Sequence, residues 1–415
     1  MRRPQRSACV VSSVAVGCLI AILCLGMPAR AADKTVSIGL SFPITGAEAG
    51  SIGRVLKGAQ MAIAEANEQG GIAGYKLNPI VLNSATTTAG QYDPAQAALN
   101  TRQLVADPTV VACIGPITSS EGKAISPLLS LADLATVTPE ATNPDITSPK
   151  FASTFRPNGK AIFFRMVATD AYQGPEMANF MYRKLNAKSV YVIDDSSAYA
   201  VGIADSFQAQ AEKLGVKVLG RDQVNSKATD FSVMLTKVAA LKPEAVYYGA
   251  SVQAGVKLVK QTYDAMPKVM KLTGDGLFGP DVLSAAGFPA AENLYVSIAS
   301  PHLVENPDMR DWIARFAKRF NTEPDDYAIT SYDAAMVILD AIKRTAESGK
   351  EVNRSNVRDA IQATKLKTLQ GEVSFDENGD INQKVISVFE IVHDTNYHDD
   401  DVLHQYKYIG VAPME

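Results

Sequence analysis

Apolar positions along this chain follow two alternating periodicities. Residues 36–40 alternate apolar with polar or small side chains, which predicts a strand, and apolar residues at helical spacing over 55–66 predict a helix. Further strands are predicted at residues 80–82, 110–114, 190–193, 216–219, 246–248, 269–272 and 294–298, most of them separated by helical patterns. This repetition predicts the α/β class, with parallel sheets covered by helices on both faces.

The alternation of predicted strands and helices changes twice along the chain. Residues 142–165 are irregular and rich in Pro and Ser, and three helical patterns without intervening strands follow Ser300. These changes mark candidate crossings between two lobes. After Gly371 strands return, and Asn378-Gly379 has the composition of a hairpin turn. We expect this turn to join strands at 373–375 and 385–392. The helical patterns after Ser300 cover residues 307–320, 326–348 and 356–363.

The amino-terminal segment has the pattern of a secretory signal peptide. Three arginines within the first six residues precede an apolar run over 10–26, and the small residues Ala29 and Ala31 flank Arg30. The run is short and interrupted by serines, which disfavours a membrane span. A lipoprotein site at Cys18 would leave an apolar octet on the exported protein. We therefore predict cleavage after Ala31, which makes residues 1–31 the signal peptide and directs the protein to the periplasm.

Removal of this leader changes the charge and the cysteine content. The leader holds four of the 40 basic residues and none of the 44 acidic ones, which leaves 36 against 44, a net charge of about −8. An acidic chain lacks the clustered Lys and Arg that nucleic acid or anionic lipid requires. Cys113 is the one cysteine outside the leader, and its apolar neighbours predict a buried packing role. No disulfide and no zinc cluster is predicted.

Signals for catalysis, metals and cofactors are weak. None of the four histidines falls in a predicted strand-end loop, so a histidine-led triad is not predicted. The Gly-rich loops lack the Lys-Ser/Thr ending of a phosphate loop. Acidic residues and histidines between 394 and 404 could bind a metal ion, but a polar acidic tail is more often a solvated loop, and we interpret it so. We predict no cofactor, no metal site and no catalytic residue.

Six segments, taken in order, resemble one known family. The segments are NEQGGIAGYKL (67–77), CIGPITSS (113–120), TPEATNPDIT (138–147), TDAYQGPEMA (169–178), DFSVMLTKVAALKPEAVYYGA (230–250) and SFDENGD (374–380). They resemble the leucine/isoleucine/valine-binding family of type I periplasmic solute-binding proteins, which serve ABC importers. The resemblance covers essentially the whole chain after the leader.

The resemblance implies two doubly wound parallel-sheet lobes joined by three hinge strands, with a ligand held in the cleft between them. We expect lobe 1 to comprise residues 32–165 plus 299–369, and lobe 2 to comprise residues 166–298 plus 370–415. The implied ligand is an amino acid or a related small polar molecule, and the implied partner is an ABC permease in the inner membrane. A monomer is expected, without nucleic acid.

The resemblance also implies roles for individual residues. In the family, a serine and a threonine that match Ser119 and Thr142 hold the ligand carboxylate, an aromatic residue matching Tyr199 covers the ligand, and an acid matching Asp275 pairs with its ammonium group. Plainer interpretations remain open: Ser119 or Ser120 could only cap a helix, and Asp275 could be a turn residue.

Two departures from the family bear on the ligand. Glu140 stands where relatives that bind branched-chain amino acids have alanine, and Ser251 stands where they place tyrosine. A roomier, more polar pocket is therefore expected, and an inward-pointing Glu140 would favour amide, amine or basic ligands over leucine. The full expected ligand site is Ser119, Ser120, Glu140, Ala141, Thr142, Tyr199, Ser251 and Asp275.

Three functions agree with these patterns to different degrees. The favoured one is the periplasmic binding component of an ABC importer, which delivers its ligand to a permease. A ligand-sensing subunit for a membrane receptor would need the same fold and cleft. A secreted α/β enzyme is much less favoured, because the acids near the expected site, such as Asp194 and Asp195, have no identifiable His or Lys partner.

Overall fold

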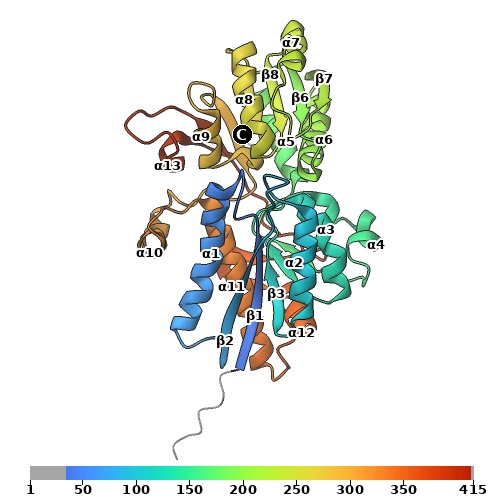
Figure 1. The fold of residues 1–415 in the computed structure, drawn as a ribbon, viewed down its shortest axis with the longest axis vertical. Coiled ribbons are helices and arrows are strands. Elements are labelled where there is room, and N and C mark those ends of the chain that lie inside the picture. Colours follow the sequence, from blue (N-terminus) through green and yellow to red (C-terminus); the bar gives the residue numbers. More distant parts are fainter. Residues whose placement is uncertain (1–33, 413–415) are drawn as a thin grey trace, which may run out of the picture.

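The computed structural model describes residues 34–412 of the 415-residue chain, so the predicted signal peptide and its cleavage site lie outside the described residues. The described part folds around two separate main sheets, one in each half of the elongated molecule (Figure 1). No helix between residues 34 and 412 is long and apolar enough to cross a membrane.

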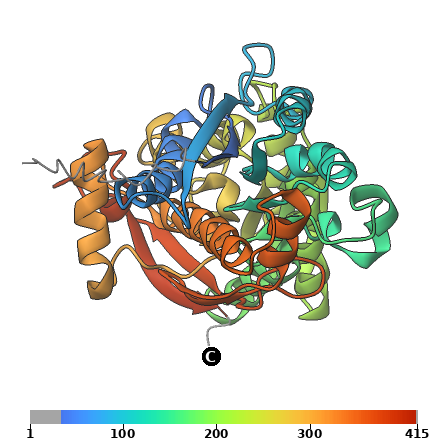
Figure 2. The same ribbon diagram turned by 90° about the horizontal axis from the view of Figure 1, so that it is seen from below.

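The first sheet has five parallel strands in the order β2-β1-β3-β4-β5. Its strands are β1 (Lys34–Phe42), β2 (Tyr75–Asn83), β3 (Val110–Ile114), β4 (Thr136–Thr138) and β5 (Phe163–Arg165). The helices around it are α1 (Ala49–Glu68), α2 (Pro94–Ala106), α3 (Ser119–Leu131), α11 (Asp326–Glu347) and α12 (Arg354–Gln362). Helices α1, α11 and α12 pack on one face, and α2 and α3 pack together on the other (Figure 1 and Figure 2).

The second sheet has seven strands in the order β14-β13-β10-β9-β8-β6-β7. Its strands are β6 (Ser189–Asp194), β7 (Lys217–Gln223), β8 (Ala245–Gly249), β9 (Met270–Thr273), β10 (Leu294–Ile298), β13 (Ile386–Ile391) and β14 (Tyr406–Ala412). The first five of these run parallel, whereas β13 and β14 add an antiparallel edge. The helices around it are α5 (Asp170–Arg183), α6 (Ala198–Lys213), α7 (Ser232–Leu241), α8 (Val252–Ala265) and α9 (Pro280–Ala286).

Shorter elements fill the connections. They are the 3-10 turns η1 (Pro144–Ile146), η2 (Pro149–Phe151), η3 (Asp275–Leu277) and η4 (Pro307–Met309), the helices α4 (Ala152–Phe155), α10 (Arg310–Phe320) and α13 (Val402–Gln405), and the strands β11 (Lys365–Thr368) and β12 (Gly371–Ser374). Helix α10 packs through Trp312 and Phe316 against Met61 of α1 and Ile329 of α11 in a small separate core.

The predicted strands are buried as the apolar runs require. Every residue of β3 is buried, including Cys113, whose thiol is free, as the sequence predicts. Strands β6 and β8 are buried along almost their whole length because helices cover both faces of the sheet. The parallel strands covered by helices that the periodicity predicts are therefore present, and so are the two doubly wound sheets that the family resemblance implies, with the antiparallel β13 and β14 as an addition to the second.

The hairpin predicted around Asn378-Gly379 is wrong. Strand β12 pairs with β11 in a two-stranded sheet, and β13 lies in the second main sheet. Two contacts hold the intervening segment to the first lobe: Phe375 packs against Phe164 with ring centroids 5.2 Å apart, and the buried Arg165 guanidinium forms an ion pair of 2.6 Å with Asp380. Tertiary packing thus separates two strands that the turn signal would have joined.

Three segments carry the chain between the two sheets. They follow β5, β10 and β12, and the first two are linked by a hydrogen bond of 2.8 Å from the Ala168 N–H to the Ala299 carbonyl. The third crossing follows β12, so it lies later than residue 369, where the sequence places it. We keep the boundaries near residues 165 and 298 as our proposed division into two lobes.

Candidate functional site

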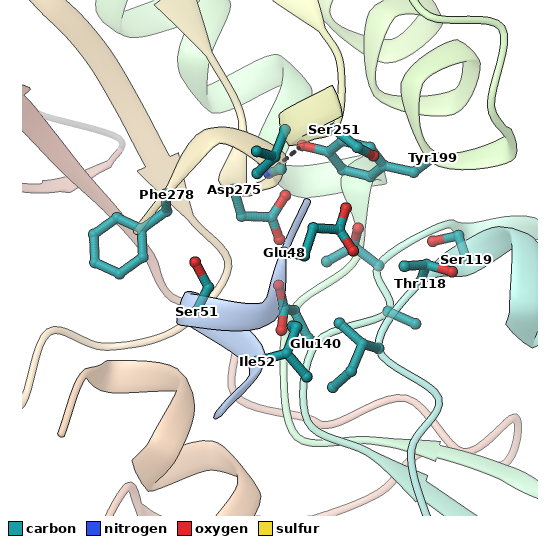
Figure 3. A pocket seen from close by; sticks show the side chains of 15 residues that line it. Glu48, Ser51, Ile52, Thr118, Ser119, Glu140, Tyr199, Ser251, Asp275 and Phe278 are labelled. Carbon is teal, nitrogen blue, oxygen red and sulfur yellow. Dashed lines mark hydrogen bonds between the residues drawn. The ribbon is translucent and has the colours of Figure 1, made fainter. Parts of the chain in front are cut away.

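A pocket lies between the two lobes and encloses about 500 Å³ of space, including the part open to solvent (Figure 3). Its walls come from the start of α1, the loops after β3 and β4, the starts of α6 and α8, and the turn η3 after β9. These are carboxyl ends of parallel strands and helix starts, the usual place for ligands in α/β folds. The lining residues are Glu48, Ser51, Ile52, Ile117, Thr118, Ser119, Glu140, Ala141, Thr142, Tyr199, Ser251, Val252, Asp275, Gly276 and Phe278.

The structure brings together seven of the eight residues expected from the sequence. Ser119, Glu140, Ala141 and Thr142 line the pocket from the first lobe, and Tyr199, Ser251 and Asp275 line it from the second. Ser120 is not among the lining residues. Its hydroxyl instead accepts a hydrogen bond of 3.2 Å from the backbone N–H of Ala198, which joins α3 to the start of α6 across the cleft.

The first-lobe wall offers hydroxyl groups beside a helix N-terminus. Ser119 and Thr142 are buried, and the Ser119 hydroxyl accepts the backbone N–H of Asn143 at 3.1 Å. A serine hydroxyl can donate its proton as well, so Ser119 can also serve an acceptor in the pocket. The amino end of α3 carries a partial positive charge. This wall is suited to an anionic group such as a carboxylate.

Helix capping at α3 does not fall to Ser119 or Ser120, the two serines that the sequence offers for it. Thr118 is the N-cap, and its hydroxyl accepts the Glu121 N–H while the Glu121 carboxylate accepts the Thr118 N–H in a capping box. The serine hydroxyls are therefore released from capping, and Ser119 is left facing the pocket.

Asp275 provides the opposite wall with a buried carboxylate. It begins η3, is 4% exposed, and accepts a hydrogen bond of 2.9 Å at Oδ2 from the Tyr327 hydroxyl of α11 in the other lobe. Its Oδ1 is buried without a partner among the described residues. Burial raises the pKa of Asp275 to about 6, against the lowering effect of the Tyr199 and Tyr327 hydroxyls.

Tyr199 closes the pocket from the second lobe. Its hydroxyl accepts the Gly276 N–H at 2.9 Å, and its ring lies directly against that glycine, because a Cβ at Gly276 would come within 2.6 Å of the ring carbon Cε1. Glycine at this position therefore permits the aromatic ring to lie in close contact with η3. The tyrosine is fixed on the same turn that carries Asp275 (Figure 3).

Glu48 and Glu140 bring two further carboxylates into the pocket. Glu48 is the residue before α1, makes no capping hydrogen bond, and is 7% exposed. Burial raises its pKa to about 8, helped by the negative charges of Glu121, Asp195 and Asp281. Burial raises the pKa of Glu140 well above its usual range, and Asp275 and Glu48 raise it further.

Glu140 was predicted from the sequence as a site residue, and Glu48 was not. Glu48 lies in the Gly-rich loop that follows the predicted strand at 36–40, and an acid in a strand-end loop was a usable signal. Ser51, Phe278 and Tyr327 were missed for another reason: nothing in the local pattern indicates that these segments meet across the cleft.

Hydrogen bonds across the cleft hold the lobes together on several sides of the pocket. The Ser51 N–H and hydroxyl both donate to Asp281 Oδ2, at 2.8 and 2.6 Å, and the Gln253 side-chain amide donates to the Ala89 carbonyl at 2.9 Å. The Asn143 amide donates to the Ala198 carbonyl at 2.6 Å. The structure is therefore a closed arrangement of the two lobes.

The pocket is acidic. Its 15 lining residues include three carboxylates and no Lys, Arg, His or Cys. Between residues 34 and 412, no group of three or more His, Cys, Asp or Glu side chains is arranged to hold a metal ion. The arrangement is suited to binding a small molecule that carries positive charge.

Comparison with known families gives one match that spans most of the chain. The family model described as "Periplasmic binding protein" matches residues 35–396. This range includes both sheets except β14 and all of the lining residues.

Individual proteins of this kind are similar over nearly their whole length. A Brucella melitensis protein named Leu/Ile/Val-binding protein homolog 3 is 30% identical over 363 residues, which is 87% of this chain and 93% of that protein. A leucine-binding protein from Thermotoga maritima superposes with a TM-score of 0.76 at 26% identity, covering 91% of this chain and 98% of that one. A Streptococcus pneumoniae branched-chain amino acid transporter substrate-binding protein, solved with isoleucine, gives a TM-score of 0.76 at 25% identity, with coverage of 91% and 100%.

Proposed function

This chain belongs to the periplasmic binding protein family, and we propose that it captures an α-amino acid between its two lobes and delivers it to a membrane permease as the binding component of an ABC importer. The relatives named for leucine, isoleucine and valine support an amino acid as the ligand class. Their sequences differ from this one at most positions, so the side chain of the ligand is a separate question.

The observation that carries the proposal is the polarity of the pocket. One wall presents the Ser119 and Thr142 hydroxyls beside the amino end of α3, and the opposite wall presents the unpartnered Oδ1 of Asp275. An α-amino acid carries a carboxylate and an ammonium group on one carbon atom. Hydroxyl and helix-end donors suit the carboxylate, and a buried aspartate makes a strong charge-assisted hydrogen bond with the ammonium.

Burial makes the ammonium contact selective. A carboxylate held away from water is unfavourable without a partner, which is consistent with the raised pKa of Asp275. A ligand ammonium restores the charged form and stabilises the closed lobes. A ligand without an amino group would leave Oδ1 of Asp275 without a hydrogen-bond donor among the described residues, and closure would then be less favourable.

We infer that the protein acts by binding rather than by catalysis. The lining residues offer no His, Lys or Cys that could act as base or nucleophile beside the carboxylates. We also infer that residues 1–31 are removed during export to the periplasm and that the exported protein is a monomer, whose partner is the permease in the inner membrane.

A thermal-shift panel tests the proposal. Amino acids are compared with analogues that lack the ammonium group or carry an amide in place of the carboxylate. A ligand at about 100 times its dissociation constant stabilises the protein by about 2.7 kcal/mol, so a true ligand raises the melting temperature clearly. At least one free amino acid should stabilise the protein while its two analogues do not. Equal shifts with the analogues, or none with any amino acid, would contradict the proposal.

A further inference from the structure

The pocket holds more negative charge than a simple amino acid requires. Asp275 alone suffices for the α-ammonium group, and the carboxylate needs donors rather than acids. Glu48 and Glu140 nevertheless also line the pocket, one at the start of α1 and the other in the loop after β4. In Figure 3 both side chains lie in the same part of the pocket as Asp275.

Each glutamate has a carboxylate oxygen to which the described residues donate no hydrogen bond. The Oε2 atoms of Glu48 and Glu140 are buried without a hydrogen-bond partner among the described residues. Glu48 is the residue before α1 and makes no capping hydrogen bond. Buried acceptors without donors cost stability, so a fold that keeps two of them beside a cavity leaves them for a group from outside.

The residues around Glu48 and Glu140 indicate which kind of ligand group would donate to them. None of the lining residues is basic, and the charges that act most on Glu140 are those of other acids. A metal ion does not fit, because the described part of the chain offers no arrangement of three acidic, histidine or cysteine ligands. An organic cation can meet carboxylates that are spread around a pocket, since its hydrogen-bond donors point in several directions.

We propose that Glu48 and Glu140 form a second cation subsite, so that the ligand of this pocket is an amino acid with a positively charged side chain. This inference rests on the proposed function, because it assumes that Asp275 and the hydroxyl wall hold the α-amino acid group. The carbon stem of such a side chain can pack on Ile52 and Phe278, which also line the pocket.

Charge balance favours such a ligand over leucine. Leucine would bring no positive charge to Glu48 or Glu140, and its apolar side chain would lie beside their unpaired oxygens. Lysine or arginine would pair with these buried oxygens. The raised pKa values of the two glutamates add a measurable consequence: a cation lowers them again, so binding near pH 7 should release protons.

Titration calorimetry with matched ligands tests the subsite. Lysine is compared with norleucine, and arginine with citrulline, because each pair differs mainly in charge. We expect the charged member to bind at least about 30-fold more tightly. Repetition in buffers of different ionisation enthalpy should detect proton release with lysine and little with norleucine. Equal or tighter binding of norleucine and citrulline would overturn the second subsite while leaving the proposed function intact. Failure of every amino acid to bind would overturn both.

Two isosteric variants assign the effect to the glutamates. Glu48→Gln and Glu140→Gln should each reduce lysine affinity about tenfold or more and reduce the preference for lysine over norleucine. Glu372→Gln, which removes an exposed acid on β12, is the control for a change in net charge and should leave both affinities within about twofold. Unchanged lysine affinity in both pocket variants would overturn the assignment, and the comparison of ligands on the unmodified protein does not depend on either variant folding.

Discussion

The Ser51 hydroxyl of α1 donates a hydrogen bond of 2.6 Å to Oδ2 of Asp281, a residue 230 positions away on α9 of the other lobe. The Ser51 backbone N–H donates to the same oxygen at 2.8 Å, so the carboxylate of Asp281 sits at the amino end of α1. Asp281 is not among the residues that line the pocket. The contact therefore joins a pocket residue, Ser51, to the other lobe and stabilises the closed arrangement.

Asp281→Ala should weaken ligand binding by favouring the open lobes. Loss of a charge-assisted pair of hydrogen bonds is worth about 1.5 to 3 kcal/mol, an effect of about tenfold or more on affinity. Small-angle scattering of the unliganded protein should show a larger radius of gyration for the variant. Unaltered affinity together with unaltered scattering would exclude a role for this contact in closure.

Ser119→Ala and Thr142→Ala should each cost about 1.5 to 3 kcal/mol of binding, because the ligand carboxylate would lose a buried donor. The corresponding loss of affinity is about tenfold to a hundredfold. Ser126→Ala is the matched control, since Ser126 lies on the same helix and its hydroxyl donates to the Gly122 carbonyl within α3. Calorimetry on the three variants should separate them, and wild-type affinity in Ser119→Ala would remove that hydroxyl from the site.

Asp275→Asn should abolish detectable binding of amino acids, because the ligand ammonium would enter a closed cleft without its charge partner. Tyr327→Phe should have a smaller effect, since it removes the hydrogen bond of 2.9 Å to Asp275 Oδ2 but leaves the carboxylate in place. We expect it to weaken binding about three- to tenfold. Both variants should keep the fold, as circular dichroism can verify. Full affinity in Asp275→Asn would refute the ammonium contact.

Most of the fold could be predicted from the sequence because the buried strands have strong local signals. Strand β3, for example, consists of five buried residues, and Asp93 followed by Pro94 marks the start of α2, where Asp93 accepts the Ala95 N–H. The carboxyl-terminal segment after Gly371 was harder to predict. The turn at Asn378-Gly379 is present, but Phe164 and Arg165 hold its neighbourhood to the first lobe, and contacts across more than 200 residues leave no local pattern.

The pocket residues also fall into those that the sequence could predict and those that it could not. Residues next to strand ends with family-like surroundings, such as Ser119 and Asp275, were predicted to be close together, and the structure places both in one pocket. Ser120 was included because adjacent serines look alike in a sequence, whereas the register of α3 turns it toward Ala198. Glu48 was missed although it lies in a strand-end loop, and its burial, which raises its pKa, leaves no local pattern in the sequence.

Glu48 should make the unliganded protein less stable as the pH rises. Its pKa is about 8 in the folded protein, against an ordinary value of 4.5, and burial is the main cause, followed by the charges of Glu121, Asp195 and Asp281. Between these two values the folded state binds more protons than the unfolded state, so the free energy of unfolding falls as pH increases. The stability that the protonated Glu48 contributes to the folded state is fully present below about pH 4.5 and is lost by about pH 8.

Glu48→Gln should therefore flatten the pH dependence of stability between pH 5 and 8 and raise the melting temperature at pH 8, because an amide cannot ionise. Glu140 and Glu121 also have raised pKa values from burial, so a smaller slope of the same sign should remain. Thermal unfolding of both proteins at several pH values measures the difference, with the exposed Glu372→Gln as control. A variant whose slope equals that of the unmodified protein would show that Glu48 ionises as freely in the folded state as in the unfolded one. A lower slope together with weaker lysine binding would instead mean that the carboxylate that serves the ligand also destabilises the empty protein.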